Sequence, residues 1–341
     1  MDQPKALKIL IEYVENSSEE FNKKIKESYS VRKFSKVIFT GMGSSLFASI
    51  PASIYLINRG VSSYYIDASE LLHYTFKILD EKTLLIVVSQ SGGTVEIINL
   101  LKKLKGKNLE TWLFTNNKNC EIANDVSMLF DIHAGEERTT STKTYTNTVL
   151  MLYFGARSIL DDLDENVFKE GYKISELISD SLSDFKKRSY DIAKELNNSQ
   201  YISLIGRGPS LSTAYQGALV IKETIKKFAE GMSGGQFRHG PLEITGKGHF
   251  AIIFAPSGKT YRINRNLAMD MTRNGSSVLC ITDVNDESSK KLSIFKLPKI
   301  PEDLVPLMEI IPIELIILNF AEIKGINIGD FSKIYKVTTT E

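Results

Sequence analysis

The chain has only two cysteines and one tryptophan among its 341 residues. Cys120 and Cys280 lie far apart in the sequence, which argues against a disulfide framework and against a cysteine-based zinc site. The four histidines, at positions 73, 133, 239 and 249, also lack the spacing of metal ligands. We therefore expect no metal and no organic cofactor, and the few cysteines favour a reducing, cytoplasmic location.

The chain also lacks an excess of charge of either sign, since its formal net charge is +1. This balance gives no electrostatic reason to expect nucleic acid or an anionic membrane surface as a partner. The most apolar late stretch, residues 304–320, contains Glu309, Glu314 and two prolines, so we expect a buried or interface helix rather than a membrane span. The N-terminus opens an acidic amphipathic helix, and we expect no signal peptide there.

Strand and helix signals alternate along most of the chain, which is typical of parallel sheets covered by helices on both faces. The predicted strands of the first half are residues 36–40, 62–66, 84–88, 111–115 and 126–132, and its predicted helices are 44–58, 95–105 and 141–163. The length is comfortable for two domains. We expect a first domain at 1–165, a helical connector at 166–198 and a second domain at 199–341.

The pattern of the first half restarts in the second. Gly41-Met42-Gly43-Ser44-Ser45-Leu46 follows one strand, and Gly206-Arg207-Gly208-Pro209-Ser210-Leu211 follows another 165 residues later. The loop at 89–94 has a counterpart at 255–260, with Ser91 and Ser257 separated by 166 residues. Two matching motifs at nearly one offset indicate an internal duplication of an α/β sandwich.

A polar loop follows the buried strand at 83–88 and precedes a predicted helix. Its sequence is Ser89-Gln90-Ser91-Gly92-Gly93-Thr94. Hydroxyls, an amide and free N–H groups at a helix start favour an anion, phosphate above all. The alternative is an ordinary N-capped turn in which Ser and Thr serve only the helix. The first copy holds more hydroxyls than the second, so we expect the first copy to bind the phosphate.

Two nucleotide-binding patterns fail on inspection. Ser257-Gly258-Lys259-Thr260 is similar to the end of a P-loop, but the earlier glycine of that motif is replaced by Ile253. Gly41 and Gly43 after a strand resemble a dinucleotide fingerprint, but its third glycine is replaced by Leu46. Neither nucleoside triphosphate nor nicotinamide chemistry is therefore favoured.

Several motifs in order resemble the sugar isomerase (SIS) family, and in particular the isomerase half of glucosamine-6-phosphate synthases and the stand-alone glucosamine-6-phosphate deaminases. The markers are Gly43-Ser44-Ser45, Ser89-Gln90-Ser91-Gly92, Ser141-Thr142-Lys143, Lys222-Glu223, Arg238-His239-Gly240-Pro241 and Lys336-Val337-Thr338. The resemblance implies two tandem SIS-type three-layer αβα sandwiches with parallel sheets. It covers residues 36–341, nearly the whole chain.

The resemblance also implies site residues. Those that would bind the sugar phosphate are Ser44, Ser45, Ser89, Gln90, Ser91, Thr94 and Thr139. Glu223 matches the base that moves a proton between C1 and C2 of the open-chain sugar. His239 matches the acid/base that opens the ring, donated by the partner subunit of a homodimer. Lys336 matches the tail lysine that engages the ketose carbonyl.

Each catalytic assignment has a structural alternative. Glu223 could be a solvated helix glutamate paired with Lys226 or Lys227. His239 could be a loop histidine that caps backbone groups. Lys336 could be a surface lysine on a frayed tail, with Lys333 nearby.

The sequence departs from the synthase pattern at several positions. Residue 2 is Asp and no cysteine precedes Cys120, so we expect no glutamine-derived ammonia. Val220, Gly93 and Gln236 stand where the synthases have a lysine and two glutamates. The loss of these charges bears on the amino-transfer step and spares phosphate binding and the base.

We therefore expect a phosphosugar aldose–ketose enzyme, most simply one that deaminates glucosamine 6-phosphate to fructose 6-phosphate and ammonia. The alternatives are a deglycase of sugar phosphates linked to an amino acid, a plain phosphosugar isomerase and a non-catalytic phosphosugar-sensing dimer.

Overall fold

The computed structural model describes residues 2–32, 34–137 and 139–329. Their backbone contacts divide them into two compact units, residues 2–175 and 176–329, and each is described by itself. The long helix α7 (Glu165–Asn197) begins in unit 1 and ends in unit 2. The predicted domain limits at 165 and 199 stay predictions.

Unit 1 contains one parallel five-stranded sheet in the order β2-β1-β3-β4-β5. The strands are β1 (Lys36–Gly41), β2 (Ser63–Asp67), β3 (Thr83–Val88), β4 (Glu110–Thr115) and β5 (Met128–Asp131). Every residue of β3 and β4 is buried, as expected for central strands covered on both faces. The apolar, branched composition of β3 is what identified that strand in the sequence.

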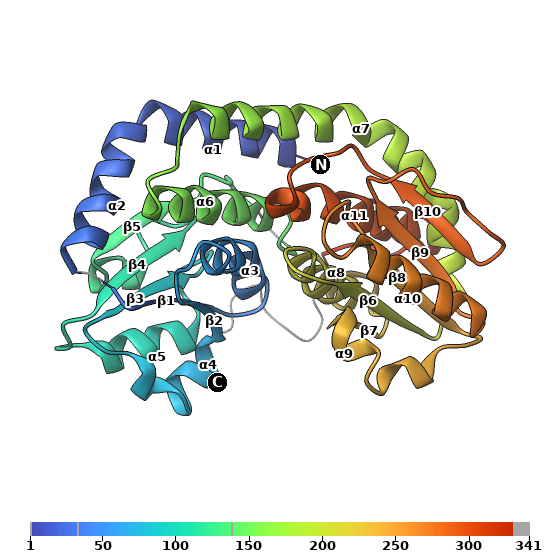
Figure 1. Cartoon of the computed structure of the whole chain (residues 1–341), viewed down its shortest axis with the longest axis horizontal. Coiled ribbons are helices and arrows are strands. Elements are labelled where there is room, and N and C mark those ends of the chain that lie inside the picture. The colour runs from blue at the N-terminus through green and yellow to red at the C-terminus, as the bar shows by residue number, and fades with distance from the viewer. Residues whose placement is uncertain (1, 33, 138, 330–341) are drawn as a thin grey trace. The chain divides into compact units, whose positions relative to one another are not determined.

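Helices cover both faces of this sheet (Figure 1). One face carries α1 (Gln3–Asn16), α2 (Ser18–Arg32), α3 (Ser44–Ile57) and α6 (Lys143–Ile159), and the other carries α4 (Ala68–His73) and α5 (Val95–Leu104). Short 3₁₀ turns lie at η1 (Phe76–Ile78) and η2 (Glu121–Asp125). The core on the α4–α5 side is formed by Ile38, Leu85 and Val87 of the sheet with Leu71, Ile97 and Leu100 of the helices.

Unit 2 repeats this architecture with a parallel sheet in the order β10-β9-β8-β6-β7. Its strands are β6 (Tyr201–Gly206), β7 (Ala229–Ser233), β8 (His249–Phe254), β9 (Ser277–Thr282) and β10 (Leu292–Lys296). Its helices are α8 (Ser210–Ile225), α9 (Gly234–Phe237), α10 (Tyr261–Arg273) and α11 (Val305–Lys324), with 3₁₀ turns η3 (Pro241–Ile244) and η4 (Glu302–Leu304). The two sheets share one strand order, so the predicted pair of three-layer αβα sandwiches is confirmed.

Among the described residues, one helical stretch, Glu302–Lys324, has the length and apolar composition of a membrane span. In its most apolar window, however, 94% of the residues are buried within the protein. Glu309 and Glu314 are among these buried residues. The burial agrees with the predicted buried or interface helix.

Candidate active site

Two loops of unit 1 meet at the carboxyl edge of its sheet. β1 and β3 are adjacent and parallel, so the segments that follow them emerge side by side. The approach is close, because a Cβ at Gly41 would lie 2.8 Å from the carbonyl oxygen of Val88. Glycine at position 41 is therefore what allows the start of α3, with Ser44 and Ser45, to lie beside the loop at 89–94.

The 89–94 loop, which we call the phosphate loop, is braced by its own hydroxyls. Ser89 Oγ accepts a hydrogen bond from Gly92 N at 3.2 Å and lies 3.3 Å from Thr94 Oγ1. Ser91 Oγ accepts from Gly93 N at 3.1 Å. Thr94 precedes α5 but makes no side-chain cap bond to it. The hydroxyls thus shape the loop rather than cap the helix.

Other polar groups at this edge have no partner in the described part of the chain. The hydroxyls of Ser44 and Ser45 and the amide of Gln90 form no hydrogen bond there, and all three residues are half-buried. The first turns of α3 and α5 add backbone N–H groups without intrahelical acceptors. Neutral donors at two helix starts are suited to an oxyanion such as a phosphate monoester.

Two residues that sequence reasoning missed support the phosphate loop from β4. Asn116 N donates to Gln90 O at 3.0 Å, and Asn117 Nδ2 donates to Ser91 O at 3.2 Å. Their position directly after a strand of the same parallel sheet was the available signal, because ligands of such sheets bind at the carboxyl ends of strands.

Thr139 lies in the segment that joins β5 to α6, at the same edge of the sheet, and is half-buried. The neighbouring Glu137 holds the start of α6, where its Oε1 accepts from Thr142 N at 3.0 Å and from Thr142 Oγ1 at 2.8 Å. The helix consequently begins at Lys143, two residues later than predicted. Among the described residues, no hydrogen bond joins Thr139 to the phosphate loop, so its role stays a prediction.

Glu223 lies on the last two turns of α8 in unit 2, and its carboxylate has no hydrogen bond or ion pair among the described residues. Lys226 Nζ donates to the main-chain oxygen of Glu223, and Lys227 Nζ donates to Asn197 O and Ser199 O. The lysine pairing that we considered for this carboxylate is therefore not formed.

Burial raises the pKa of Glu223 above its usual value, although the positive charges of Lys226 and Lys222 act in the opposite direction. Such a carboxyl is suited to act as a base nearer neutral pH.

His239 follows α9 and is exposed, with its N–H bonded to Gln236 O at 2.9 Å. Within the part of unit 2 that the structure describes, no hydrogen bond or ion pair joins His239 to Glu223. Lys336 and Lys333 lie outside the described residues. The catalytic roles of Glu223, His239 and Lys336 therefore remain predictions.

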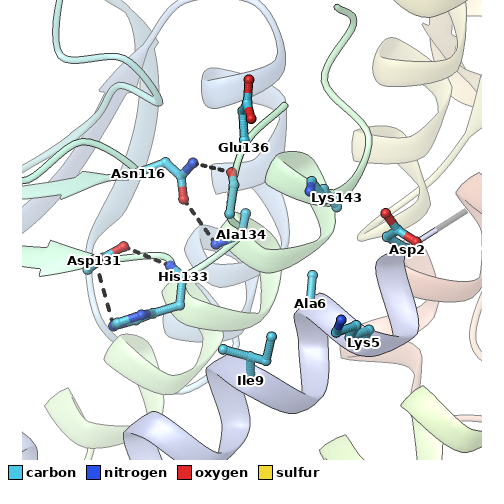
Figure 2. A pocket seen from close by; sticks show the side chains of 11 residues that line it. Asp2, Lys5, Ala6, Ile9, Asn116, Asp131, His133, Ala134, Glu136 and Lys143 are labelled. Carbon is cyan, nitrogen blue, oxygen red and sulfur yellow. Dashed lines mark hydrogen bonds and ion pairs between the residues drawn. The ribbon is translucent and has the colours of Figure 1, made fainter. Parts of the chain in front are cut away.

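A cavity of about 580 Å³ lies in unit 1, next to Asn116 but apart from the phosphate loop. Figure 2 shows Lys5, Ala6 and Ile9 of α1 on one side of it and Asp131 and His133 on the other. None of the predicted phosphate-binding residues lines it.

Burial lowers the pKa of His133, which favours its neutral form. Across the described ranges, no group of three or more His, Cys, Asp or Glu side chains could hold a metal ion.

A model of the SIS domain family matches residues 30–156 and 195–323. The chain belongs to the SIS domain family. Each match covers one of the two sheets, so the family assignment and the duplication made from the sequence are both confirmed.

Similar proteins agree with this assignment. The isomerizing glutamine–fructose-6-phosphate aminotransferase of Pyrococcus horikoshii is 33% identical over 316 residues, which is 91% of this chain and 52% of that protein. That of Sulfurisphaera tokodaii is 27% identical over 342 residues, which is 100% of this chain and 55% of that protein. The chain thus spans about half the length of the curated relatives it matches.

Solved structures show the same fold. The C-terminal domain of glucosamine-fructose-6-phosphate aminotransferase from Francisella tularensis has a TM-score of 0.84 at 20% identity and covers 96% of this chain and 95% of that one. Glucosamine-6-phosphate deaminase from Thermotoga maritima has a TM-score of 0.73 at 20% identity and covers 97% and 99%. At such low identity these likenesses bear on the fold alone.

Proposed function

We propose that the chain is a phosphosugar aldose–ketose enzyme whose phosphate loop, with Ser44 and Ser45, binds the phosphate of the substrate. The observation that carries the proposal is the set of unpartnered hydroxyl and amide groups at the carboxyl edge of the unit 1 sheet. The hydrogen bonds that shape the loop leave Ser44, Ser45 and Gln90 available to a ligand.

The reaction we propose is the isomerising deamination of glucosamine 6-phosphate. His239 assists ring opening, and Glu223 then takes the proton from C2 of the open-chain aldehyde to give an enolamine. Return of the proton to C1 leaves an imine at C2, and addition of water releases ammonia and fructose 6-phosphate. Glu223 fits the base because its carboxylate is unpaired and burial raises its pKa.

The names of the similar proteins support this substrate class. The relatives from Pyrococcus horikoshii and Sulfurisphaera tokodaii are isomerizing glutamine–fructose-6-phosphate aminotransferases, and the Thermotoga maritima neighbour is a glucosamine-6-phosphate deaminase. We further propose that the chain works as a homodimer in which His239 of one subunit serves the substrate of the other. Its exposed position on the segment after α9 is compatible with this role.

The test is ammonia release from glucosamine 6-phosphate by the purified protein and by Glu223→Gln. We expect release by the wild type and a loss of about 10²–10⁴-fold in the variant, the usual contribution of a general base. The exposed Glu287 provides a matched control, and Glu287→Gln should keep full activity.

Other outcomes would separate the alternatives. A deglycase or plain isomerase would release no ammonia from this substrate, but Glu223 would still exchange a C1 or C2 proton with solvent. A sensor would be stabilised against heat by fructose 6-phosphate and would catalyse no such exchange. Either result would overturn the deaminase assignment.

A further inference from the structure

Each unit has a loop at the same place in its sheet, but the side chains near the two loops form different hydrogen bonds. The phosphate loop follows β3, and its counterpart, residues 255–260, follows β8 at the same place in the second sheet. Ser89 N bonds to Phe114 O in unit 1, and Ala255 N bonds to Ile281 O in unit 2. The loops are therefore equivalent in hydrogen bonding as well as in sequence.

The residue that follows the next strand is also equivalent in the two units. Asn116 follows β4, and Asp283 follows β9. The next backbone N–H bonds to the last threonine of the strand in both cases, Asn117 N to Thr115 Oγ1 at 3.1 Å and Val284 N to Thr282 Oγ1 at 3.0 Å. Asn116 and Asp283 thus start from the same backbone position.

Their side chains bond to different partners. The Asp283 carboxylate binds the second loop, where it accepts hydrogen bonds from Ser257 N and, at 2.5 Å, from Ser257 Oγ. Asn116 instead bonds away from the phosphate loop, accepting from Ala134 N at 3.0 Å and donating to Gly135 O at 2.8 Å (Figure 2). Ser91, the counterpart of Ser257, has no side-chain acceptor at its backbone N–H among the described residues.

A second carboxyl group fills the neighbouring helix start in unit 2. Glu309 is 1% exposed and accepts from Ser210 Oγ at 2.8 Å and from Thr213 Oγ1 at 2.9 Å. Ser210 corresponds to Ser45 of unit 1, whose hydroxyl is unpartnered in the described chain. The cavity lined by Asp283 and Glu309 is about 10 Å³, room for about one water.

We propose that Asp283 is an internal anion that occupies the second loop, and that Asn116 leaves the first loop open to a phosphate monoester. On this proposal, the residue that follows β4 or β9, Asn116 or Asp283, determines which of the two units binds a phosphate ligand. Carboxylate and phosphate oxygens accept the same N–H and O–H donors, so one excludes the other. The part that concerns unit 1 rests on the proposed function.

The first arm of the test places the aspartate in unit 1. Asn116→Asp should weaken fructose 6-phosphate binding at least about tenfold more than Asn116→Ala, because the new carboxylate accepts from Ser91 and repels the phosphate. The alanine variant accounts for the lost bonds to Ala134 and Gly135. Equal affinities in the two variants, measured by titration calorimetry, would contradict the proposal.

The second arm removes the aspartate from unit 2 and uses inorganic phosphate as the probe. Wild type should bind one phosphate per chain and Asp283→Ser two, whereas Asp283→Glu, which keeps a carboxylate at this position, should bind one. No gain of bound phosphate in Asp283→Ser over wild type, with an unchanged circular dichroism spectrum, would overturn the proposal. If wild type binds no fructose 6-phosphate, the proposed function is refuted. The second arm still tests the role of Asp283, because it concerns the loop of unit 2.

Discussion

Gly92 of the phosphate loop lies directly against Cys120. A Cβ at residue 92 would lie 2.3 Å from both the Cβ and the Sγ of Cys120, and the backbone of Gly92 has a φ of +66°. Cys120 is 8% exposed, and burial raises the pKa of its thiol. Cys120 follows β4, and its contact with Gly92 constrains the path of the phosphate loop.

Replacing Gly92 by alanine should therefore distort the phosphate loop. Gly60 provides the control, because its φ is +85° and nothing lies within 4 Å of its missing Cβ. Gly60→Ala should cost only the backbone strain of about 1–2 kcal/mol. Gly92→Ala should lower the melting temperature further and should also abolish the thermal shift produced by fructose 6-phosphate. An unchanged ligand-induced shift would show that the contact with Cys120 does not shape the site.

The raised pKa of Glu223 predicts the acid limb of the pH–rate profile. The base acts only when deprotonated, so kcat/KM should fall as the pH drops through a value above 4.5, the ordinary pKa of a glutamate. Lys222 and Lys226 lower this pKa through their charges. Lys222→Gln should therefore move the acid limb to higher pH, and a shift to lower pH would contradict the assignment.

The position of the phosphate loop could be predicted from the sequence because its signals are local. The phosphate loop lies between a buried strand and an amphipathic helix, and both are visible as runs of residues at 83–88 and 95–104. The duplication was visible because the two copies keep one offset. These features depend on residues that are neighbours in the chain.

The remaining features depend on contacts between distant segments. The sequence does not show that Asn116 bonds to 134–135 whereas Asp283 bonds to Ser257, since both follow a similar strand. It also does not show that Cys120 packs on Gly92, or that Lys226 and Lys227 bond to main-chain oxygens instead of the Glu223 carboxylate. Glu137 likewise moves the start of α6 through bonds to Thr142.

His249 predicts how the stability of unit 2 depends on acid. The ring is 1% exposed, with Nδ1 3.0 Å from Ser276 Oγ and Nε2 3.0 Å from Ser203 Oγ, and burial lowers its pKa from 6.5 to about 4. The unfolded chain therefore binds a proton more readily than the folded one. The free energy of unfolding should decrease as the pH falls from 6.5 towards 4, by up to about 3 kcal/mol.

Urea unfolding at a series of pH values checks this expectation. His249→Gln should be less stable than wild type at pH 8, but its free energy of unfolding should decrease less between pH 6.5 and 4. The exposed His73 offers a control, because its replacement by Gln should keep the wild-type slope. An equal slope in wild type and His249→Gln would show that another group controls the acid sensitivity.

The proposed donation of His239 across a dimer predicts complementation between two inactive chains. Each mixed dimer of Glu223→Gln and His239→Asn subunits would contain one site with both defects and one with neither. Random association makes half of the dimers mixed, so co-expressed chains should recover about a quarter of the wild-type activity. Each variant alone should stay inactive. Tagged subunits should first show that mixed dimers are present. If they are, and the mixture is no more active than the mean of the two variants, then Glu223 and His239 of the same subunit serve one substrate.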